Sequence, residues 1–408
     1  PLTLVDEDFG KQQLDLMLRD RYIHPNGQIP AYEWNFGDVN PPVQAWAAWR
    51  LYREEQAREG RGDRAFLEGV FHKLLLNFTW WVNRKDALEN NVFEGGFLGL
   101  DNIGVFDRSA PLPGGGTLEQ ADGTAWMALY ALNLFEIALE LAAEDRGYQE
   151  IAGKFYEHFL YIAAAMDRMG ENQDELWDEE DGFYYDLLRF PDGRAQRIEL
   201  RSLVGLLPLA ASALIRPDRI ERLPELHRRI ARLNRHHPEL TRNMTNLDQP
   251  GPTGLRLLSV VNEAKLRRIL ARLFDEEEFL SPYGIRSLSR AHRDRPFVLT
   301  MDRHLYRVAY EPAESQSWLF GGNSNWRGPV WFPINVLLLD ALQRLHGYYG
   351  PWFRVECPTG SGRRLNLEEA GREIAGRLAR IFRREEGRRA VFGGTRKFQD
   401  CLLYTSDA

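Results

Sequence analysis

The stretch TLEQADGTAWMALYALNLFEIALELAA, residues 117–143, decides the fold class, because its apolar residues recur with the period of an α-helix. Its first apolar stripe consists of Trp126, Leu129, Tyr130, Leu134, Ile137 and Leu141. Leu132, Phe135 and Leu139 add a second stripe, so the pattern predicts a helix that is buried nearly all round. Thr117–Gln120 fits a capping box and predicts where this helix begins.

Other helical stretches differ in how much of their surface is apolar. The segment around Leu266, Ile269 and Leu273 carries arginines on its outer side, which is typical of a one-sided surface helix. Alternation of fully apolar and one-sided helices predicts an inner and an outer layer in one all-α domain of about ten helices, since Val/Ile-rich strand runs are scarce. Further helices are expected near 9–18, 42–57, 65–83, 147–168, 200–214, 220–234, 330–346 and 367–384.

Composition excludes several classes of protein. The 408 residues are 44% hydrophobic and 27% charged, which is ordinary for a globular chain. A net charge of −7 argues against a nucleic-acid partner. The chain has no uninterrupted apolar run of about 18 residues, which argues against a membrane span. Two cysteines cannot form a disulfide scaffold and favour a reducing, cytoplasmic location.

Both ends of the sequence have unusual features. The chain opens at Pro1 without a secretion signal, and its last eight residues, CLLYTSDA (401–408), resemble translated adapter sequence at the end of a metagenomic fragment. We therefore expect a single domain over residues 1–400 that is truncated at both ends, followed by an artefactual tail.

Five long connections combine aromatic residues with carboxylates and amides, and this mixture suits a carbohydrate. Indole rings stack on the C–H faces of a sugar, and charged groups bind its hydroxyls. Trp34, Trp177 and Trp326 stand in these polar loops, whereas Trp46 and Trp80 fall inside predicted helices and are expected in the core. The five loops are residues 32–38, 95–109, 171–186, 281–289 and 320–331.

Asp101 is the candidate catalytic acid. Glycoside hydrolysis needs one carboxylic acid that protonates the leaving oxygen and one carboxylate that activates water or attacks the sugar. Asp101 stands among Phe97, Leu98, Ile103 and Val105, and apolar surroundings raise a carboxyl pKa. The sequence has no pattern of metal ligands and no phosphate-binding loop, so we expect neither a metal nor a cofactor.

In these loops the sequence resembles glycoside hydrolase family 63, the group of processing α-glucosidases and mannosylglycerate hydrolases. The resemblance covers nearly the whole chain, and it implies an (α/α)6 toroid of six inner and six outer helices, of which about ten would be present here. It also implies a carbohydrate partner. The motifs are WNFGDVNPPVQAWA, GGFLGLDNIGVFDRS, LWDEEDGFYYD, YGIRSLS and NWRGPVWFPIN.

The resemblance also implies roles for particular residues. Asp101 matches the general acid of the family, although Ile103-Gly-Val replaces the Pro-Arg part of the usual motif. The residues expected to contact sugar are Tyr32, Trp34, Asp38, Gln44, Asn102, Trp177, Asp178, Trp326, Arg327 and Trp331. The family's general base is a Glu that we expect beyond residue 400, with Glu311 and Glu314 as weaker substitutes.

The expected function is therefore inverting hydrolysis of α-linked glucosides or mannosides by the parent protein, with this fragment inactive. Two alternatives stay open. A helical-toroid sugar isomerase or epimerase would usually employ a pair of histidines, but none of the five loops contains a histidine, apart from His24 shortly before the first. A non-catalytic carbohydrate-binding toroid would bind sugar without needing Asp101. The sugar, the linkage and the oligomeric state are not specified by the sequence.

Overall fold

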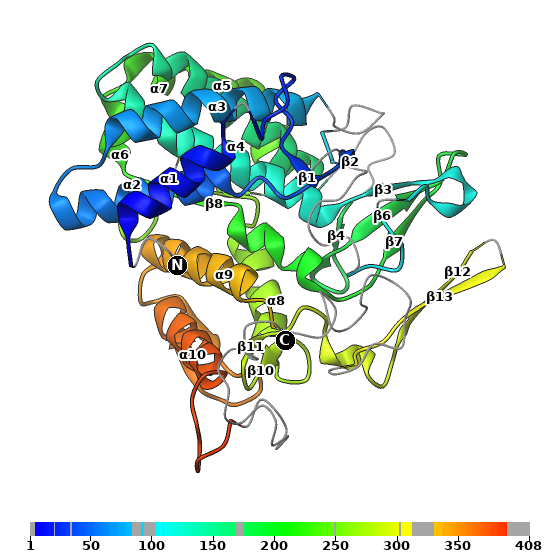
Figure 1. Ribbon diagram of the computed structural model, residues 1–408. Helices are drawn as coiled ribbons and strands as arrows, with labels where there is room; N and C mark the ends of the chain where they lie inside the picture. Colours follow the sequence, from blue (N-terminus) through cyan, green and yellow to red (C-terminus); the bar gives the residue numbers. More distant parts are fainter. Residues whose placement is uncertain are drawn as a thin grey trace.

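The computed structural model describes most of the chain, and the described part is mostly helical (Figure 1). The described residues are 5–19, 21–32, 35–83, 91–93, 103–108, 110–167, 175–242, 244–248, 250–301, 303–311 and 330–389. Within these ranges the α-helices are α1 (Glu7–Met17), α2 (Gln44–Glu59), α3 (Arg64–Val82), α4 (Ala121–Ala142), α5 (Tyr148–Ala165), α6 (Pro217–Glu221), α7 (Pro224–His236), α8 (Glu263–Leu273), α9 (Phe332–Tyr349) and α10 (Leu367–Arg380).

Helix α4 forms the centre of the main hydrophobic core. All of its residues except Glu140 are buried, which confirms the two apolar stripes predicted for this segment. Among the described helices, α4 alone is long and apolar enough to cross a membrane, but 94% of its most apolar 18-residue window is buried inside the molecule. Its apolar surface is therefore covered by neighbouring elements of the same chain.

Helices α2 and α4 lie side by side and run in the same direction. The hydroxyl of Tyr52 on α2 donates a hydrogen bond to Glu140 on α4 (2.9 Å). One turn earlier, Trp49 on α2 hydrogen-bonds Glu136 on α4. Because a step of three residues along α2 matches a step of four along α4, the helices are parallel, and in this register α2 begins beside the middle of α4.

Other helices are buried on one side only, as their periodicity predicts. On α8 the leucines and isoleucine are buried, while Arg267 and Arg268 on the outer side form ion pairs with acidic residues. Helix α10 begins with a capping box, in which Asn366 and Glu369 each bind the other's backbone N–H. Its buried apolar residues likewise lie on one side.

The expectation of an all-α domain is corrected by seven small antiparallel sheets among the described residues. The strands are too short to show the alternating pattern that identifies longer ones, so no period in the sequence predicts them. The sheets pair β1 (Pro30–Tyr32) with β2 (Asn35–Val39), β4 (Trp177–Asp178) with β5 (Phe183–Tyr184), β8 (Ser212–Ile215) with β9 (Arg256–Ser259), β10 (Leu280–Ser281) with β11 (Gly284–Ile285), β12 (Phe297–Met301) with β13 (His304–Val308) and β14 (Arg354–Glu356) with β15 (Arg364–Asn366), and they join β3 (Thr117–Glu119), β6 (Asp186–Arg189) and β7 (Ala195–Ile198) in the order β3-β6-β7.

Two local predictions are wrong. Residues 200–214 do not form an α-helix but the short 3-10 helices η3 (Leu203–Gly205) and η4 (Leu207–Ala210) followed by β8. Pro208 explains the difference, because proline lacks the N–H that an α-helix needs and clashes with the preceding turn. Thr117 does not cap α4 either, since it begins strand β3, and α4 starts after Gln120 without a side-chain cap.

The three-stranded sheet and the β12-β13 hairpin lie together on one flank of the helical body (Figure 1). They enclose a second apolar cluster that includes Phe106, Leu188, Leu288 and Tyr310. This cluster holds the described end of the second predicted loop against the sheet, so that loop approaches the start of α4 from this flank.

Candidate functional site

The starts of α2 and α4 carry buried polar groups without partners. Gln44 is the first residue of α2 and is 8% exposed, and Gln120 directly precedes α4 and is 1% exposed. Neither side-chain amide oxygen has a hydrogen-bond partner within the described ranges, and the same holds for the indole N–H of Trp126 one turn into α4. Buried polar atoms are rarely left unpaired, so each of these two helix starts requires an explanation.

Arg108 occupies the centre of the charged groups at the start of α4. Its Nη1 donates to Asp122 Oδ2 (2.8 Å), and its Nη2 donates to Asp186 Oδ2 (2.6 Å). The other oxygen of Asp186 accepts the backbone N–H of Ala121, the first residue of α4 (2.8 Å). The three charged side chains are almost fully buried. We call Arg108, Gln120, Asp122, Trp126 and Asp186 the helix-start cluster.

The charges of this cluster do not fully balance. Burial raises the pKa of Asp186 above its ordinary value, in opposition to the positive charge of Arg108. Burial also disfavours the charged guanidinium, but Asp122 and Asp186 outweigh it and raise the pKa of Arg108 above its usual range. One cation thus faces two carboxyl groups. Arg108 Nε and Asp122 Oδ1 have no partner in the part of the chain that the structure describes.

A second charged region lies on the opposite face of residues 198–202. Ile198, Leu200 and Ser202 line the narrow space beside Arg108 and Asp186. The alternate residues Glu199 and Arg201 face a polar cavity of about 360 Å³. Alternation of this kind is the side-chain period of an extended chain. The cavity is lined by Asp178, Glu180, Asp181, Glu199, Arg201, Ala291, His292 and Arg295.

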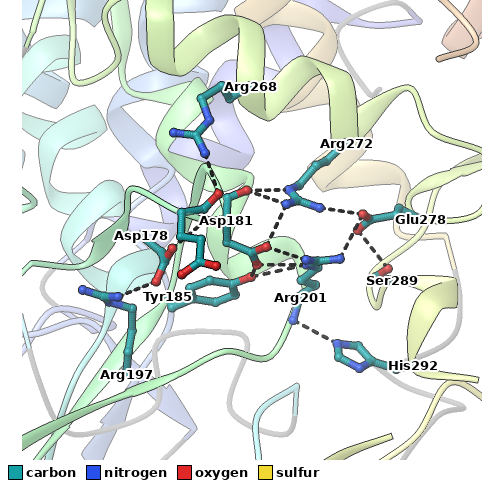
Figure 2. A network of polar contacts seen from close by, with 11 residues as sticks. Asp178, Asp181, Tyr185, Arg197, Arg201, Arg268, Arg272, Glu278, Ser289 and His292 are labelled. Atoms are coloured by element: carbon teal, nitrogen blue, oxygen red, sulfur yellow. Dashed lines mark hydrogen bonds and ion pairs between the residues drawn. The ribbon is translucent and has the colours of Figure 1, made fainter. Parts of the chain in front are cut away.

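The wall of this cavity is a continuous network of ion pairs (Figure 2). Arg201 contacts Asp181 (2.6 Å) and Glu278 (3.1 Å), and Arg272 contacts the same two carboxylates (2.9 and 2.7 Å). The second oxygen of Glu278 accepts the hydroxyl of Ser289 (3.2 Å). We call Asp181, Arg201, Arg272, Glu278 and Ser289 the polar network, and its carboxylates are paired with arginines on both sides.

The surroundings of the polar network hold its groups in fixed protonation states. Burial opposes ionisation of Asp181, but its hydrogen bonds from Arg201 and Tyr185 and the charge of Arg272 outweigh burial and lower the pKa of Asp181. Burial lowers the pKa of His292, whose Nε2 accepts the backbone N–H of Arg201 (3.0 Å). This histidine is therefore neutral near pH 7 and engaged as an acceptor.

Trp177 and Asp178, two of the predicted sugar contacts, stand beside this network on strand β4. The indole of Trp177 is 3% exposed, with the ammonium of Lys265 4.9 Å from its ring centre, and its N–H donates to Glu179 (2.6 Å). Asp178 pairs with Arg197. The indole of Trp177 is thus largely covered by protein. Its role as a platform on which a sugar stacks stays a prediction.

The other predicted site residues fall into three groups. Gln44 begins α2, and Trp331 directly precedes α9, where its carbonyl accepts the N–H of Asn335 (3.0 Å). Tyr32 and Asp38 belong to the β1-β2 hairpin that leads to α2, but their side chains lie outside the description. Asp101, Asn102, Trp34, Trp326, Arg327 and Glu314 lie outside the described residues altogether. Their roles remain predictions.

Sequence reasoning missed Arg108, Gln120 and Asp186. The residue types alone carry no signal, because the partners of Arg108 lie 14 and 78 residues away along the chain. One clue was available: Arg108 stands two residues after the apolar run Ile103–Phe106, and an arginine close to buried residues needs buried carboxylates.

Comparison with known proteins gives the class. Residues 251–390 match the family described as mannosylglycerate hydrolase MGH1-like glycoside hydrolase domain. A 101-residue stretch, 24% of this chain, is 34% identical to part of the mannosyl-oligosaccharide glucosidase of Saccharomyces cerevisiae and covers 8% of that enzyme. The chain is thus similar to glycoside hydrolases.

Within that class, the chain is like glycoside hydrolase family 63, and the resemblance stated from its motifs is confirmed. The uncharacterized protein YMR196W of Saccharomyces cerevisiae is 52% identical over 421 residues, which span 100% of this chain and 39% of the yeast protein. An uncharacterized conserved protein from Thermus thermophilus shares the fold, with a TM-score of 0.54 at 16% identity over 93% of this chain and 81% of that one.

Proposed function

We propose that this chain forms the catalytic domain of an inverting glycoside hydrolase that acts on α-linked glucosides or mannosides. The match of residues 251–390 to a glycoside hydrolase domain carries the reaction class. Inversion, the choice of sugar and the α-linkage go beyond that match and rest on the resemblance to family 63. The chain covers 39% of its yeast relative, so the activity of the whole protein is part of the proposal.

The proposed architecture is an (α/α)6 toroid. Two features of the described helices support it: α4 is buried on all sides while α8 and α10 are one-sided, and α2 and α4 run parallel. In such an arrangement the connections that precede the inner helices gather at one end. Residues 95–109, which contain Asp101, precede α4, and residues 32–38 precede α2.

Asp101 is proposed as the general acid. Its carboxyl proton passes to the glycosidic oxygen as the bond from that oxygen to the anomeric carbon breaks. A second carboxylate takes a proton from the water that attacks the opposite face, so the products are an alcohol and a sugar of inverted configuration. Inversion requires the two carboxyl groups to lie about 6.5–9.5 Å apart. The sequence expectation places this base beyond residue 400.

The unpartnered amide oxygens of Gln44 and Gln120 suit a substrate with hydroxyl groups. Each is a fixed acceptor that gains a hydrogen bond when a sugar hydroxyl arrives, and a buried acceptor left unpaired costs about 1–3 kcal/mol. A sugar hydroxyl bound at either residue would remove that cost there. Gln44 is one of the sugar contacts expected from the sequence, and Gln120 extends that set.

Proton NMR of the first product formed by the full-length protein tests the mechanism. We expect the β-anomer from methyl α-glucoside or methyl α-mannoside, and Asp101→Asn should lower kcat about 10²–10⁴-fold. Asp107→Asn, six residues further along the same loop, is the matched control and should retain activity. An α-anomer as the first product would contradict inversion. Full activity of Asp101→Asn would contradict the assignment of the acid. Absence of hydrolysis by the wild type would contradict the proposed function and leave a non-catalytic sugar-binding toroid or an isomerase to be tested.

A further inference from the structure

We propose that Arg108 is a positioning residue for the proposed general acid, an inference that rests on the assignment of Asp101 above. Arg108 does not take part in proton transfer itself. It fixes the end of the chain segment that carries the acid by binding two carboxylates on two different elements, Asp122 on α4 and Asp186 on β6.

The segment from Ile103 to Arg108 is held along its described length. Ile103 is fully buried in the main core, two residues after Asp101 in the sequence. Phe106 packs in the second cluster, where its ring meets the ring of Tyr306 on β13 edge-on, with the two ring centres 5.1 Å apart. Apolar contacts are non-directional and permit small shifts of the backbone along the cluster. Arg108 supplies the directional contact that fixes the register.

The geometry uses a property that arginine has and lysine lacks. The guanidinium is a planar fork, and its two terminal nitrogens bind different carboxylates at 2.8 and 2.6 Å. Because Asp186 also accepts the N–H of Ala121, the guanidinium, the start of α4 and strand β6 are joined in one connected set of hydrogen bonds. A lysine ammonium is more compact than the guanidinium fork, so it could approach both carboxylates only if they or the backbone shifted.

Displacement of an acid has a specific kinetic consequence. Departure of an alkoxide from a methyl glycoside needs protonation, whereas fluoride is a good leaving group and depends much less on an acid. A variant in which the acid is misplaced therefore loses activity on methyl glycosides but retains it on glycosyl fluorides. A change that merely weakens the fold or sugar binding lowers both reactions together.

The experiment compares Arg108→Lys with Asp101→Asn in the full-length protein. Substrates are methyl α-glucoside and α-glucosyl fluoride, or the corresponding mannose pair, whichever the wild type hydrolyses. For Arg108→Lys we expect kcat on the methyl glycoside to fall about 10- to 100-fold with KM little changed, and kcat on the fluoride to fall less than about 3-fold. Asp101→Asn should show the same pattern with a larger loss.

Arg189→Lys is the matched control. Arg189 lies three residues after Asp186 on β6 and forms a similarly buried ion pair with Glu119 (2.7 Å), so its replacement perturbs the same sheet but leaves the two carboxylates that bind Arg108 in place. We expect both substrates to be hydrolysed at wild-type rates. Asp186→Asn, which keeps the size of the side chain and removes its charge, is a second test variant should Arg108→Lys fail to fold, and we expect the same selective loss from it.

The outcomes separate the two proposals. Equal loss on both substrates in Arg108→Lys and Asp186→Asn, or no loss in either, would overturn the positioning role while Asp101→Asn still discriminated between the leaving groups. Failure of Asp101→Asn to discriminate would overturn the proposed function itself. A selective loss in Arg189→Lys as well would show that any disturbance of β6 misplaces the acid, and it would also overturn a specific role for Arg108.

Discussion

The helix-start cluster and the polar network lie on opposite faces of residues 198–202. They differ in how many arginines neutralise their buried carboxylates. In the polar network, Asp181 and Glu278 each contact both Arg201 and Arg272. In the helix-start cluster one guanidinium serves two carboxyl groups, and polar atoms of four of its five residues lack partners within the described ranges. Groups that satisfy one another stabilise a fold, whereas unpaired groups remain available for a ligand or for chemistry.

The largest expected effect is the loss of Arg108. Arg108→Met leaves Asp122 and Asp186 buried without a counter-charge, and the free energy of unfolding should fall by about 3–5 kcal/mol. In this variant Arg108 no longer opposes the effect of burial, so the pKa of Asp186 rises further and the folded state binds a proton that the unfolded state releases. Stability then decreases as pH rises. Urea denaturation at pH 5 and pH 8 should show the smaller loss at pH 5, and equal losses would indicate that the pair is not isolated from water.

Removal of one charge from the polar network should cost less. Asp181→Asn keeps the shape of the side chain but weakens its hydrogen bonds with Arg201, Arg272 and Tyr185, and the free energy of unfolding should fall by about 1–3 kcal/mol. Because this region is assigned to stability, the ratio of rates on methyl glycoside and glycosyl fluoride should not change. Glu180→Gln, an exposed neighbour in the same cavity wall, is the control and should leave stability unaltered. A changed rate ratio in Asp181→Asn would place the network in the catalytic machinery.

The pH dependence of stability sharpens the same contrast. Because the pKa of Asp181 is lowered in the folded state, its ion pairs contribute stability above its ordinary value of 3.8, and this contribution is lost as pH falls through the lowered value. Urea denaturation of wild type and Asp181→Asn between pH 5 and pH 3 should show curves that converge toward the acid end. If the two curves of unfolding free energy against pH stayed parallel, protonation of Asp181 would not be the cause of the loss of stability in acid.

The smallest expected effect has the opposite sign. Gln120→Met replaces a buried amide, whose oxygen has no partner among the described residues, by an apolar side chain of similar length, so the free energy of unfolding should stay the same or rise by up to about 1 kcal/mol. The KM for methyl α-glucoside or methyl α-mannoside should rise roughly 10-fold, because a sugar hydroxyl loses its acceptor. A loss of stability with an unchanged KM would assign Gln120 to the fold instead.

The helical part of the fold was predictable from the sequence for a physical reason. Periodicity depends on neighbouring residues, and α4, α8 and α10 show it clearly, so their position and burial agree with the structure. The strands were not predictable, since most have five residues or fewer and each is stabilised by a partner strand. The 3-10 helices around Pro208 show how one proline interrupts an otherwise helical apolar pattern.

The candidate site was predictable only where a residue type itself suggests chemistry. Gln44, Trp177 and Asp178 were chosen for their polar or aromatic character within a motif, and the structure places Gln44 at a helix start and the other two beside the polar network. Arg108 and Asp186 were missed because their role depends on a pairing across 78 residues. Such a pairing exists only once the sheet and α4 have come together.

The alternation along residues 198–202 has a consequence for changes in chain length. This stretch pairs with residues 287–289 through the bridge between Ser202 and Leu288. Its backbone lies between the helix-start cluster on one side and the polar cavity on the other. Deletion of one residue just before Arg201 would reverse the direction of the side chains that follow. Arg201 would then face the narrow space beside Arg108 and Asp186, and Ser202 would face the polar cavity. Point replacements at Glu199 leave this partition intact, so natural variants should differ here in residue type but keep the same number of residues.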